Sequence, residues 1–157
     1  PVGVHMIYVH DARELEKAVN AQYDDCDALV MAAAVSDYRP AVRAENKIKK
    51  EQHDHLNIEL TENPDILYGL GQKKTHQFLV GFAAETRDVI EYGKAKLAKK
   101  NLNLLVANDV AQQGAGFNVS TNIAALIYKD GHIEQYPKMT KDDLGHIIIE
   151  KIVEGIN

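Results

Sequence analysis

Apolar residues along the chain fall into short uninterrupted runs separated by longer stretches with helical spacing. Uninterrupted apolar runs are typical of parallel strands that are covered on both faces. We expect three such strands, at Asp27–Ala34, Gln77–Ala83 and Leu102–Ala107. His5–Val9 is predicted as a further short strand. Leu56–Leu60 alternates apolar and polar side chains, which predicts a half-buried strand.

Four stretches carry the signals of helices: a residue that can cap the first turn, followed by apolar side chains three and four positions apart. In the second of these, Pro64 suits the first turn because proline has no amide hydrogen to leave unpaired. The helices are predicted to start at Asp11, Asn63, Thr86 and Thr140, and the first three to end near Ala21, Gly69 or Gly71, and Lys100.

Asp130-Gly131 stands between two apolar segments, Asn122–Tyr128 and His132–Tyr136, which is a strong signal for a β-hairpin. Alternating strands and helices that end in a hairpin predict an α/β domain. We expect a mainly parallel sheet with a C-terminal antiparallel hairpin. Residues 1–157 are predicted to form a single domain, because no linker or repeat divides them.

Composition narrows the classes of protein that need to be considered. The chain is 45% hydrophobic, carries a formal charge of −5, and contains one cysteine, Cys26. The acidic balance disfavours a general nucleic-acid binder. No apolar run is long enough to span a bilayer, so we expect a cytoplasmic protein. The chain opens with Pro1, followed at once by a predicted strand, which suggests that an amino-terminal part is absent.

A single cysteine excludes an internal disulfide. Asp24, Asp25 and Asp27 surround Cys26, and their charges oppose a thiolate and raise its pKa. We therefore do not expect Cys26 to be a catalytic nucleophile.

Ligands of open α/β sheets bind beyond the carboxyl ends of parallel strands. Here the predicted strand ends follow Ala34, Phe82 and Ala107. The first ends in three alanines, followed shortly by Asp37 and Arg39. Small side chains at this place allow a ligand to approach the backbone.

Other candidate motifs have plainer explanations. Gly69-Leu70-Gly71 follows a predicted helix rather than a strand, so we interpret it as a helix C-cap and not as a dinucleotide fingerprint. Gly114-Ala115-Gly116 is interpreted as a mobile loop. His53 and His55 could hold a metal, but no third ligand has supporting spacing, so a solvated loop is favoured.

Lysines form two groups of interest. Lys47-Ile48-Lys49-Lys50 lies in the long loop after the alanine strand. It is either a solvated charge run or part of a lid over a phosphate group. Lys96 and Lys100 share one helix face, which is ordinarily solvated.

Six segments occur in a characteristic order: AAAVSDYRPA, KIKK, ENPDIL, GFAAET, KLAKKN and VAND. Together they resemble the phosphopantothenate–cysteine ligase family, also called phosphopantothenoylcysteine synthetase, from about His5 to Ile152. The KIKK form resembles the bacterial branch that uses CTP. The resemblance implies a Rossmann-like three-layer domain, preceded in the family by a strand, a glycine-containing loop and a helix that do not precede Pro1.

The resemblance also implies a reaction and its site. In this family 4′-phosphopantothenate reacts with CTP, in the presence of Mg²⁺, to give an acyl-cytidylate and pyrophosphate. The amine of L-cysteine then displaces CMP. Lys47 is implied to stabilise the first step, while Ala33 and Ala34 lie beside the acyl phosphate and Asn108 is a candidate on the substrate side. The implied nucleotide contacts are Asp37, Asn63, Pro64, Asp65, Ile66, Phe82, Lys96 and Lys100, with backbone amides of residues 64–66 opening a helix.

The family forms homodimers and is often fused to a flavin-dependent decarboxylase, whose chemistry is not expected in these residues. Two alternatives remain open. One is a generic nucleotide- or NAD-binding protein, which the missing glycine fingerprint disfavours. The other is a non-catalytic nucleotide-binding fragment.

Overall fold

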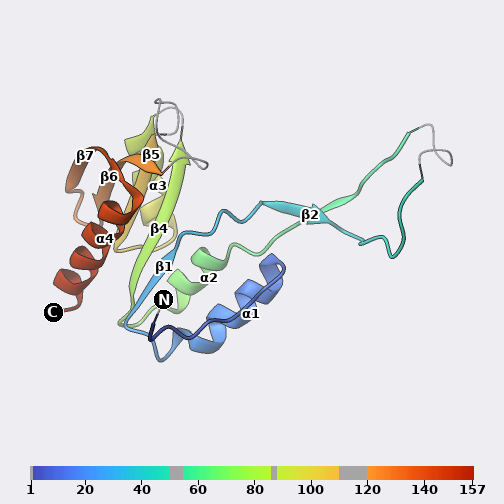
Figure 1. The fold of residues 1–157 in the computed structure, drawn as a ribbon, viewed down its shortest axis with the longest axis horizontal. Helices are drawn as coiled ribbons and strands as arrows, with labels where there is room; N and C mark the ends of the chain where they lie inside the picture. The colour runs from blue at the N-terminus through green and yellow to red at the C-terminus, as the bar shows by residue number, and fades with distance from the viewer. Residues whose placement is uncertain (1, 50–54, 86–87, 110–119) are drawn as a thin grey trace.

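The computed structural model describes residues 2–49, 55–85, 88–109 and 120–157. Within these ranges the chain forms a five-stranded sheet, a separate two-stranded ribbon and helices on both faces of the larger sheet (Figure 1). The predicted α/β class with a Rossmann-like layered arrangement is confirmed. Within the described ranges, no helix combines the length and apolar character that crossing a membrane requires.

The sheet has the strand order β1-β4-β5-β6-β7. Parallel pairing joins the first three strands, and antiparallel pairing joins β5 to β6 and β6 to β7. The predicted hairpin is confirmed, with Gly131 at a φ of 89° in its turn. The strands are β1 (Ala28–Met31), β4 (Phe78–Glu85), β5 (Leu104–Asp109), β6 (Thr121–Tyr128) and β7 (Ile133–Thr140).

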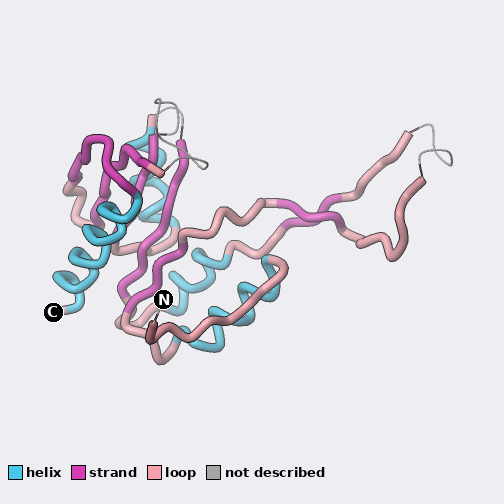
Figure 2. The backbone as a smooth tube through the Cα atoms, viewed as in Figure 1, coloured by secondary structure: helices cyan, strands magenta, loops and turns pink. Residues whose placement is uncertain are grey.

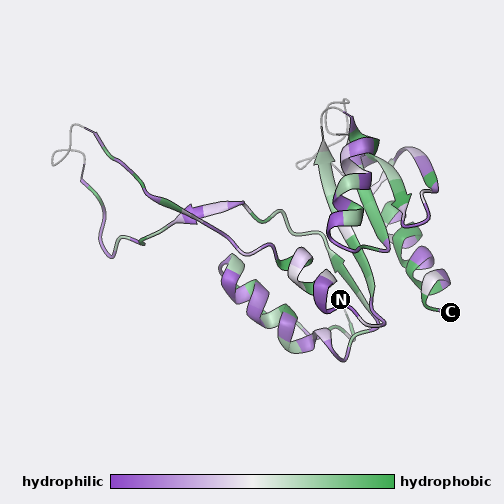
Figure 3. Cartoon of the chain, turned by 180° about the vertical axis from the view of Figure 1, so that it is seen from behind, coloured by the Kyte–Doolittle hydropathy of each residue, from purple (hydrophilic) through white to green (hydrophobic). Residues whose placement is uncertain are grey.

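Helices cover the two faces of this sheet separately. Tyr23, Leu70 and Leu97, from three different helices, lie in one buried cluster with Leu79 and Leu105 of the strands. A second cluster places α4 on the opposite face. Figure 3 shows the apolar strands between the mixed surfaces of the helices. The helices are α1 (Ala12–Tyr23), α2 (Ile66–Lys73), α3 (Val89–Lys99) and α4 (Lys141–Ile156).

Two predicted helix starts are confirmed by their caps. The carboxylate of Asp11 accepts hydrogen bonds from the amides of Arg13 and Glu14, both at 2.9 Å. Thr140 Oγ1 accepts from the amide of Asp143 at 3.0 Å. These bonds satisfy amides that would otherwise lack a partner in the first turn.

The second and third helix starts were predicted wrongly. Asp65, not Asn63, caps α2, because its carboxylate accepts from the amide of Tyr68 at 3.1 Å. Gly69 and Gly71 lie inside α2 rather than at its end. The N-cap position of α3 is held by Asp88, and the predicted cap Thr86 lies outside the described residues.

Several strand predictions also need correction. β1 is short and lies at the edge of the sheet, so Val30 is 41% exposed instead of covered on both sides. The segments His5–Val9 and 56–59 are not strands, and their apolar side chains are exposed. A strand-like pattern becomes a strand only where a neighbouring backbone pairs with it over several residues. Among the described residues neither segment belongs to a strand ladder, and the single bond from the Ala41 amide to the Glu59 carbonyl does not make one.

The segment between β1 and α2, predicted as a loop and a strand, is instead an arm that extends away from the sheet (Figures 1 and 2). We define the arm as residues 38–49 and 55–62. Near its base β2 (Tyr38–Pro40) pairs antiparallel with β3 (Leu60–Glu62), and the amide of Ala41 donates to the carbonyl of Glu59 at 2.9 Å. The exposed apolar side chains of the arm are Tyr38, Val42, Ile48, Leu56, Ile58 and Leu60.

Candidate functional site

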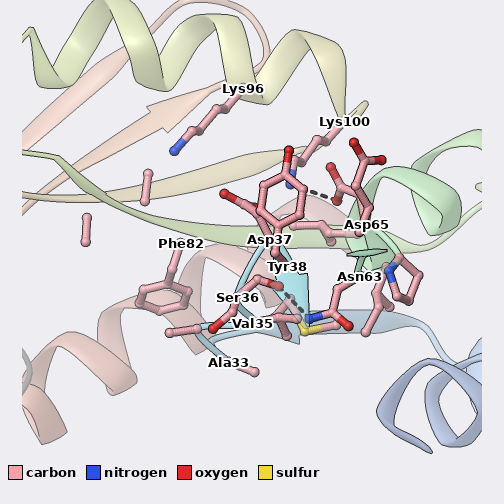
Figure 4. Close-up of a pocket in the computed structure, with 18 residues that line it drawn as sticks. Ala33, Val35, Ser36, Asp37, Tyr38, Asn63, Asp65, Phe82, Lys96 and Lys100 are labelled. Carbon is pink, nitrogen blue, oxygen red and sulfur yellow. Dashed lines mark hydrogen bonds and ion pairs between the residues drawn. The ribbon is translucent and has the colours of Figure 1, made fainter. Parts of the chain in front are cut away.

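A cavity of about 530 Å³ opens beyond the carboxyl ends of β1 and β4 (Figure 4). The start of α2 and the last turns of α3 also reach it, because Asp65 and Lys100 both line its wall. This is the position at which open α/β sheets bind ligands. Its lining residues are Met31, Ala33 to Tyr38, Glu62 to Leu67, Phe82, Ala83, Ala84, Lys96 and Lys100.

Most of the residues singled out from the sequence lie in this one wall. They come from four segments that are far apart along the chain. The structure brings together Ala33, Ala34, Asp37, Asn63, Pro64, Asp65, Ile66, Phe82, Lys96 and Lys100. Their shared position is a finding, whereas the contact that each makes with a nucleotide stays a prediction.

Two predicted residues do not line the cavity. Lys47 is exposed on the arm, and the neighbouring Lys50 lies outside the described residues. Asn108 stands near the carboxyl end of β5, where it pairs in register with Ala84. Its Oδ1 atom is buried and has no hydrogen-bond partner in the described part of the chain.

The side chain of Asn63 is occupied by protein groups at both ends. Nδ2 donates to the carbonyl of Ser36 at 2.8 Å (Figure 4). Oδ1 accepts from Arg39 Nη1 at 3.2 Å. The amide of Asn63 donates to the carbonyl of Asp37 at 2.7 Å. Asn63 therefore shapes the cavity by joining its wall to the base of the arm. The sequence prediction missed Ser36 and Arg39, although both stand in the segment SDYRP that marked the site.

Positive charge enters the cavity from α3. Lys96 and Lys100, one turn apart, both line it, so their shared face is not simply a solvated one. Lys100 Nζ lies 2.8 Å from Asp65 Oδ1, and the Lys100 side chain is only 25% exposed. Cations are also favoured at the carboxyl end of a helix by its dipole. The wall thus presents ammonium groups suited to an anionic ligand.

The backbone amides that open α2 are not those of residues 64–66, as predicted from the sequence. Pro64 carries no amide hydrogen, and α2 begins only at Ile66. The amide of Tyr68 is already bonded to Asp65. The helix start that can face an anion is therefore the backbone at Ile66 and Leu67, both of which line the cavity.

No group of three or more His, Cys, Asp or Glu with metal-binding proximity occurs among the described residues. His53 of the histidine pair lies outside them, so that alternative is not addressed by the structure. The cavity does contain the carboxylates of Asp37 and Asp65. One or two carboxylates together with ligand phosphates are the usual surroundings of Mg²⁺, so this donor set fits a magnesium–nucleotide complex.

Cys26 lies outside the cavity lining, and its thiol donates to the carbonyl of Tyr23 with an Sγ to O distance of 3.2 Å. Burial is the main cause that raises the pKa of Cys26, and the charge of Asp27 adds to it. The predicted direction of the pKa shift is confirmed. Desolvation outweighs the like-charge repulsion on which the prediction was based.

Comparisons with known proteins agree on the kind of domain. The family model of the DNA/pantothenate metabolism flavoprotein C-terminal domain matches residues 1–156. The chain is 45% identical over 153 residues to the coenzyme A biosynthesis bifunctional protein CoaBC of Bacillus subtilis (strain 168), covering 97% of this chain and 37% of that protein. It is 42% identical over 156 residues to CoaBC of Escherichia coli (strain K12), covering 98% and 38% respectively.

A solved structure, the crystal structure of the C-terminal domain of the bifunctional protein CoaBC, superposes with a TM-score of 0.78 at 36% identity. The match covers 97% of this chain and 66% of that one. The chain thus spans under two-fifths of the length of the two curated relatives.

Proposed function

The chain belongs to the family of the DNA/pantothenate metabolism flavoprotein C-terminal domain, and on that premise we propose that it ligates L-cysteine to 4′-phosphopantothenate in coenzyme A biosynthesis. Its curated relatives are named coenzyme A biosynthesis bifunctional proteins. One observation carries the proposal: a single cavity is surrounded by the alanine strand end, the start of α2, Phe82, Lys96 of α3 and Lys100 at the end of α3.

The proposed reaction uses CTP to activate a carboxylate. A carboxylate oxygen of phosphopantothenate attacks the α-phosphorus of CTP, and the bond to the bridging oxygen breaks, which releases pyrophosphate. The amine of cysteine then attacks the acyl carbon, loses a proton and displaces CMP, which leaves the amide. The first step brings two anions together, so the protein must supply positive charge at the reacting phosphate.

The cavity residues can divide these tasks. Lys96 and Lys100 provide charge for the phosphates from α3. Ala33 and Ala34 leave room for an acyl phosphate close to the backbone, because a methyl group is the whole of their side chains. Asn108 stands outside the cavity lining, and its proposed role on the substrate side rests on its buried Oδ1, which has no hydrogen-bond partner among the described residues.

Lys47 belongs to the proposed mechanism only if the arm changes position. It stands outside the cavity lining in this structure. Its exposed position on the arm, which starts at the cavity wall, is compatible with folding over a bound nucleotide.

Mg²⁺ is proposed to accompany CTP and to neutralise part of the phosphate charge. Asp37 and Glu62, which both line the cavity wall, could hold it, since the third carboxylate, that of Asp65, is bonded to Lys100. Phosphate oxygens of the nucleotide would supply further ligands to the Mg²⁺ ion.

We further propose a homodimer and a fusion partner. The arm exposes a series of apolar side chains, and such surfaces on soluble proteins mark protein–protein contacts. A second copy of the chain would cover them. Fusion to a flavin-dependent decarboxylase is supported by the word bifunctional in the names of the relatives and by the share of their length that this chain spans.

Calorimetric titration with CTP, ATP and NAD, each with Mg²⁺, tests the proposal. CTP is expected to bind most tightly, and NAD not to compete with it. Pyrophosphate release should then require phosphopantothenate as well as CTP. Equal or tighter binding of NAD would contradict the proposed function and favour a generic dinucleotide-binding protein.

A further inference from the structure

Helix α2 contains two glycines, Gly69 and Gly71, that have very different surroundings. Glycine inside a helix is less stable than alanine, so a glycine in that position calls for a structural explanation. A Cβ atom at Gly69 would meet no atom within 4 Å. A Cβ atom at Gly71 would overlap the carbonyl oxygen of Lys100 and lie 2.9 Å from its carbonyl carbon. Only Gly71 is therefore required by packing, and what it packs against is the backbone of Lys100.

The residue after Lys100 locks this contact in place. Asn101 has a positive φ of 52°, a conformation that asparagine tolerates better than most residues. Its Nδ2 atom donates to the carbonyl of Gly71 at 2.9 Å. Lys74 Nζ donates to the carbonyl of Asn101 at 2.9 Å, and Lys129 Nζ donates to its Oδ1 at 3.3 Å. The end of α3 is thus held by α2 with its C-cap residue Lys74 and by Lys129 of the β6–β7 turn.

Lys100 is consequently attached to α2 at two places. Its backbone rests on Gly71, near the carboxyl end of the helix. Its ammonium group lies 2.8 Å from Asp65 Oδ1, at the N-cap of the same helix and in the cavity wall (Figure 4). A long flexible side chain that is held at both ends loses less conformational freedom when it binds a ligand.

We propose that Gly71 and Asn101 are positioning residues that set where the Lys100 ammonium stands in the cavity, and hence how tightly the cavity binds the polyphosphate of a nucleotide. Neither residue lines the cavity, so each acts through Lys100. The proposal rests on the proposed function for the identity of the ligand. The position of Lys100 relative to Asp65 can be measured without any ligand.

The test compares Gly71→Ala with the matched control Gly69→Ala, two positions away in the same helix. Gly71→Ala is expected to weaken CTP binding about tenfold or more, the effect of losing a hydrogen bond to a charged group. Gly69→Ala is expected to leave the Kd unchanged. Asn101→Asp is the second variant, since it keeps the size and the positive φ but places a carboxylate oxygen against the Gly71 carbonyl. Its effect on the Kd should have the same direction.

A double-mutant cycle separates positioning from a general loss of stability. In a Lys100→Met background, Gly71→Ala should cause no further loss of CTP affinity, because the group through which it acts is gone. Additive losses, or an unchanged Kd in Gly71→Ala and Asn101→Asp, would overturn the proposal.

Crystal structures of the unliganded variants give the ligand-independent result. In Gly71→Ala, or in Asn101→Asp if the first variant does not fold, Lys100 Nζ should move out of hydrogen-bond range of Asp65. An intact ion pair in these variants overturns the positioning role. A broken pair in a protein whose wild type binds no CTP supports the positioning role and contradicts the proposed function.

Discussion

Asn63 donates a hydrogen bond from Nδ2 to the carbonyl oxygen of Ser36 at 2.8 Å, across a separation of 27 residues. With the bonds to Arg39 and Asp37, this contact ties both ends of the arm together at the point where they enter the cavity wall. The cavity wall and the base of the arm therefore share one set of hydrogen bonds.

Replacement of Asn63 by alanine is expected to lower the free energy of unfolding by about 1–2 kcal/mol, because two side-chain hydrogen bonds are lost and the Ser36 carbonyl loses its partner. CTP affinity should fall as well, since the wall loosens. Urea unfolding and calorimetric titration measure the two effects. Asn63→Asp keeps the acceptor for Arg39 but loses the donor to Ser36. If it lowers the stability as much as alanine does, the lost stability comes from the bond to the Ser36 carbonyl. An unchanged free energy of unfolding in both variants would contradict the role of Asn63 in holding the two ends of the arm together.

Lys47→Gln is expected to slow the release of pyrophosphate by raising the barrier about 2–4 kcal/mol, as the loss of one charge-stabilising donor typically does. CTP affinity should change far less. Lys49→Gln, which removes a charge of the same arm two positions away, is the control and should leave the rate nearly unchanged. Equal effects of the two substitutions would show that only the overall charge of the segment matters.

Cys26 is expected to react slowly with a thiol reagent in the folded chain at pH 8, several-fold slower than in urea. Its raised pKa means that the folded state holds the thiol proton more tightly than the unfolded state does. The corresponding contribution to the free energy of unfolding is present below the ordinary pKa of 9.0 and is lost as the pH rises through the folded value. Equal reaction rates in the folded and unfolded chain at pH 8 would contradict this assignment.

Gly93→Ala is expected to lower the free energy of unfolding by about 1–3 kcal/mol through overpacking. A Cβ atom at this position of α3 would press on the side chains of Ile127 and Leu105, 3.1 Å from Leu105 Cδ2. Gly145→Ala in α4 is the matched control, because nothing lies within 4 Å of its Cβ position. That variant should gain up to about 1 kcal/mol from helix propensity. Urea unfolding of the two variants measures the difference, and equal changes would show that α3 is not closely packed.

Local signals in the sequence predicted the elements whose stability depends on local chemistry. Asp11 and Thr140 cap their helices as expected, since a cap needs only the amides of the following turn. The Asp130-Gly131 turn likewise defined the hairpin, because its strands are neighbours in the sequence. The apolar run of β4 was predicted correctly as a buried strand, since it is covered by clusters on both faces.

Other elements depended on partners that sequence patterns do not specify. His5–Val9 and 56–59 have strand-like patterns, yet among the described residues neither belongs to a strand ladder. The paired strands of the arm, Tyr38–Pro40 and Leu60–Glu62, were missed or misplaced for the same reason: they are short, largely exposed and far apart along the chain.

The sequence by itself determined the family, the layered α/β class and the residue types of the candidate site, because apolar periodicity and short motifs are properties of neighbouring residues. Only the tertiary structure decided that the backbone of Lys100, at the end of α3, packs on Gly71 of α2 and that the Lys100 ammonium lies beside Asp65. It alone also decided that Asn63 is a clamp and that Lys47 stands apart on the arm. The physical reason is that these relationships depend on close packing and hydrogen bonds between distant segments, whose geometry exists only once the sheet has assembled.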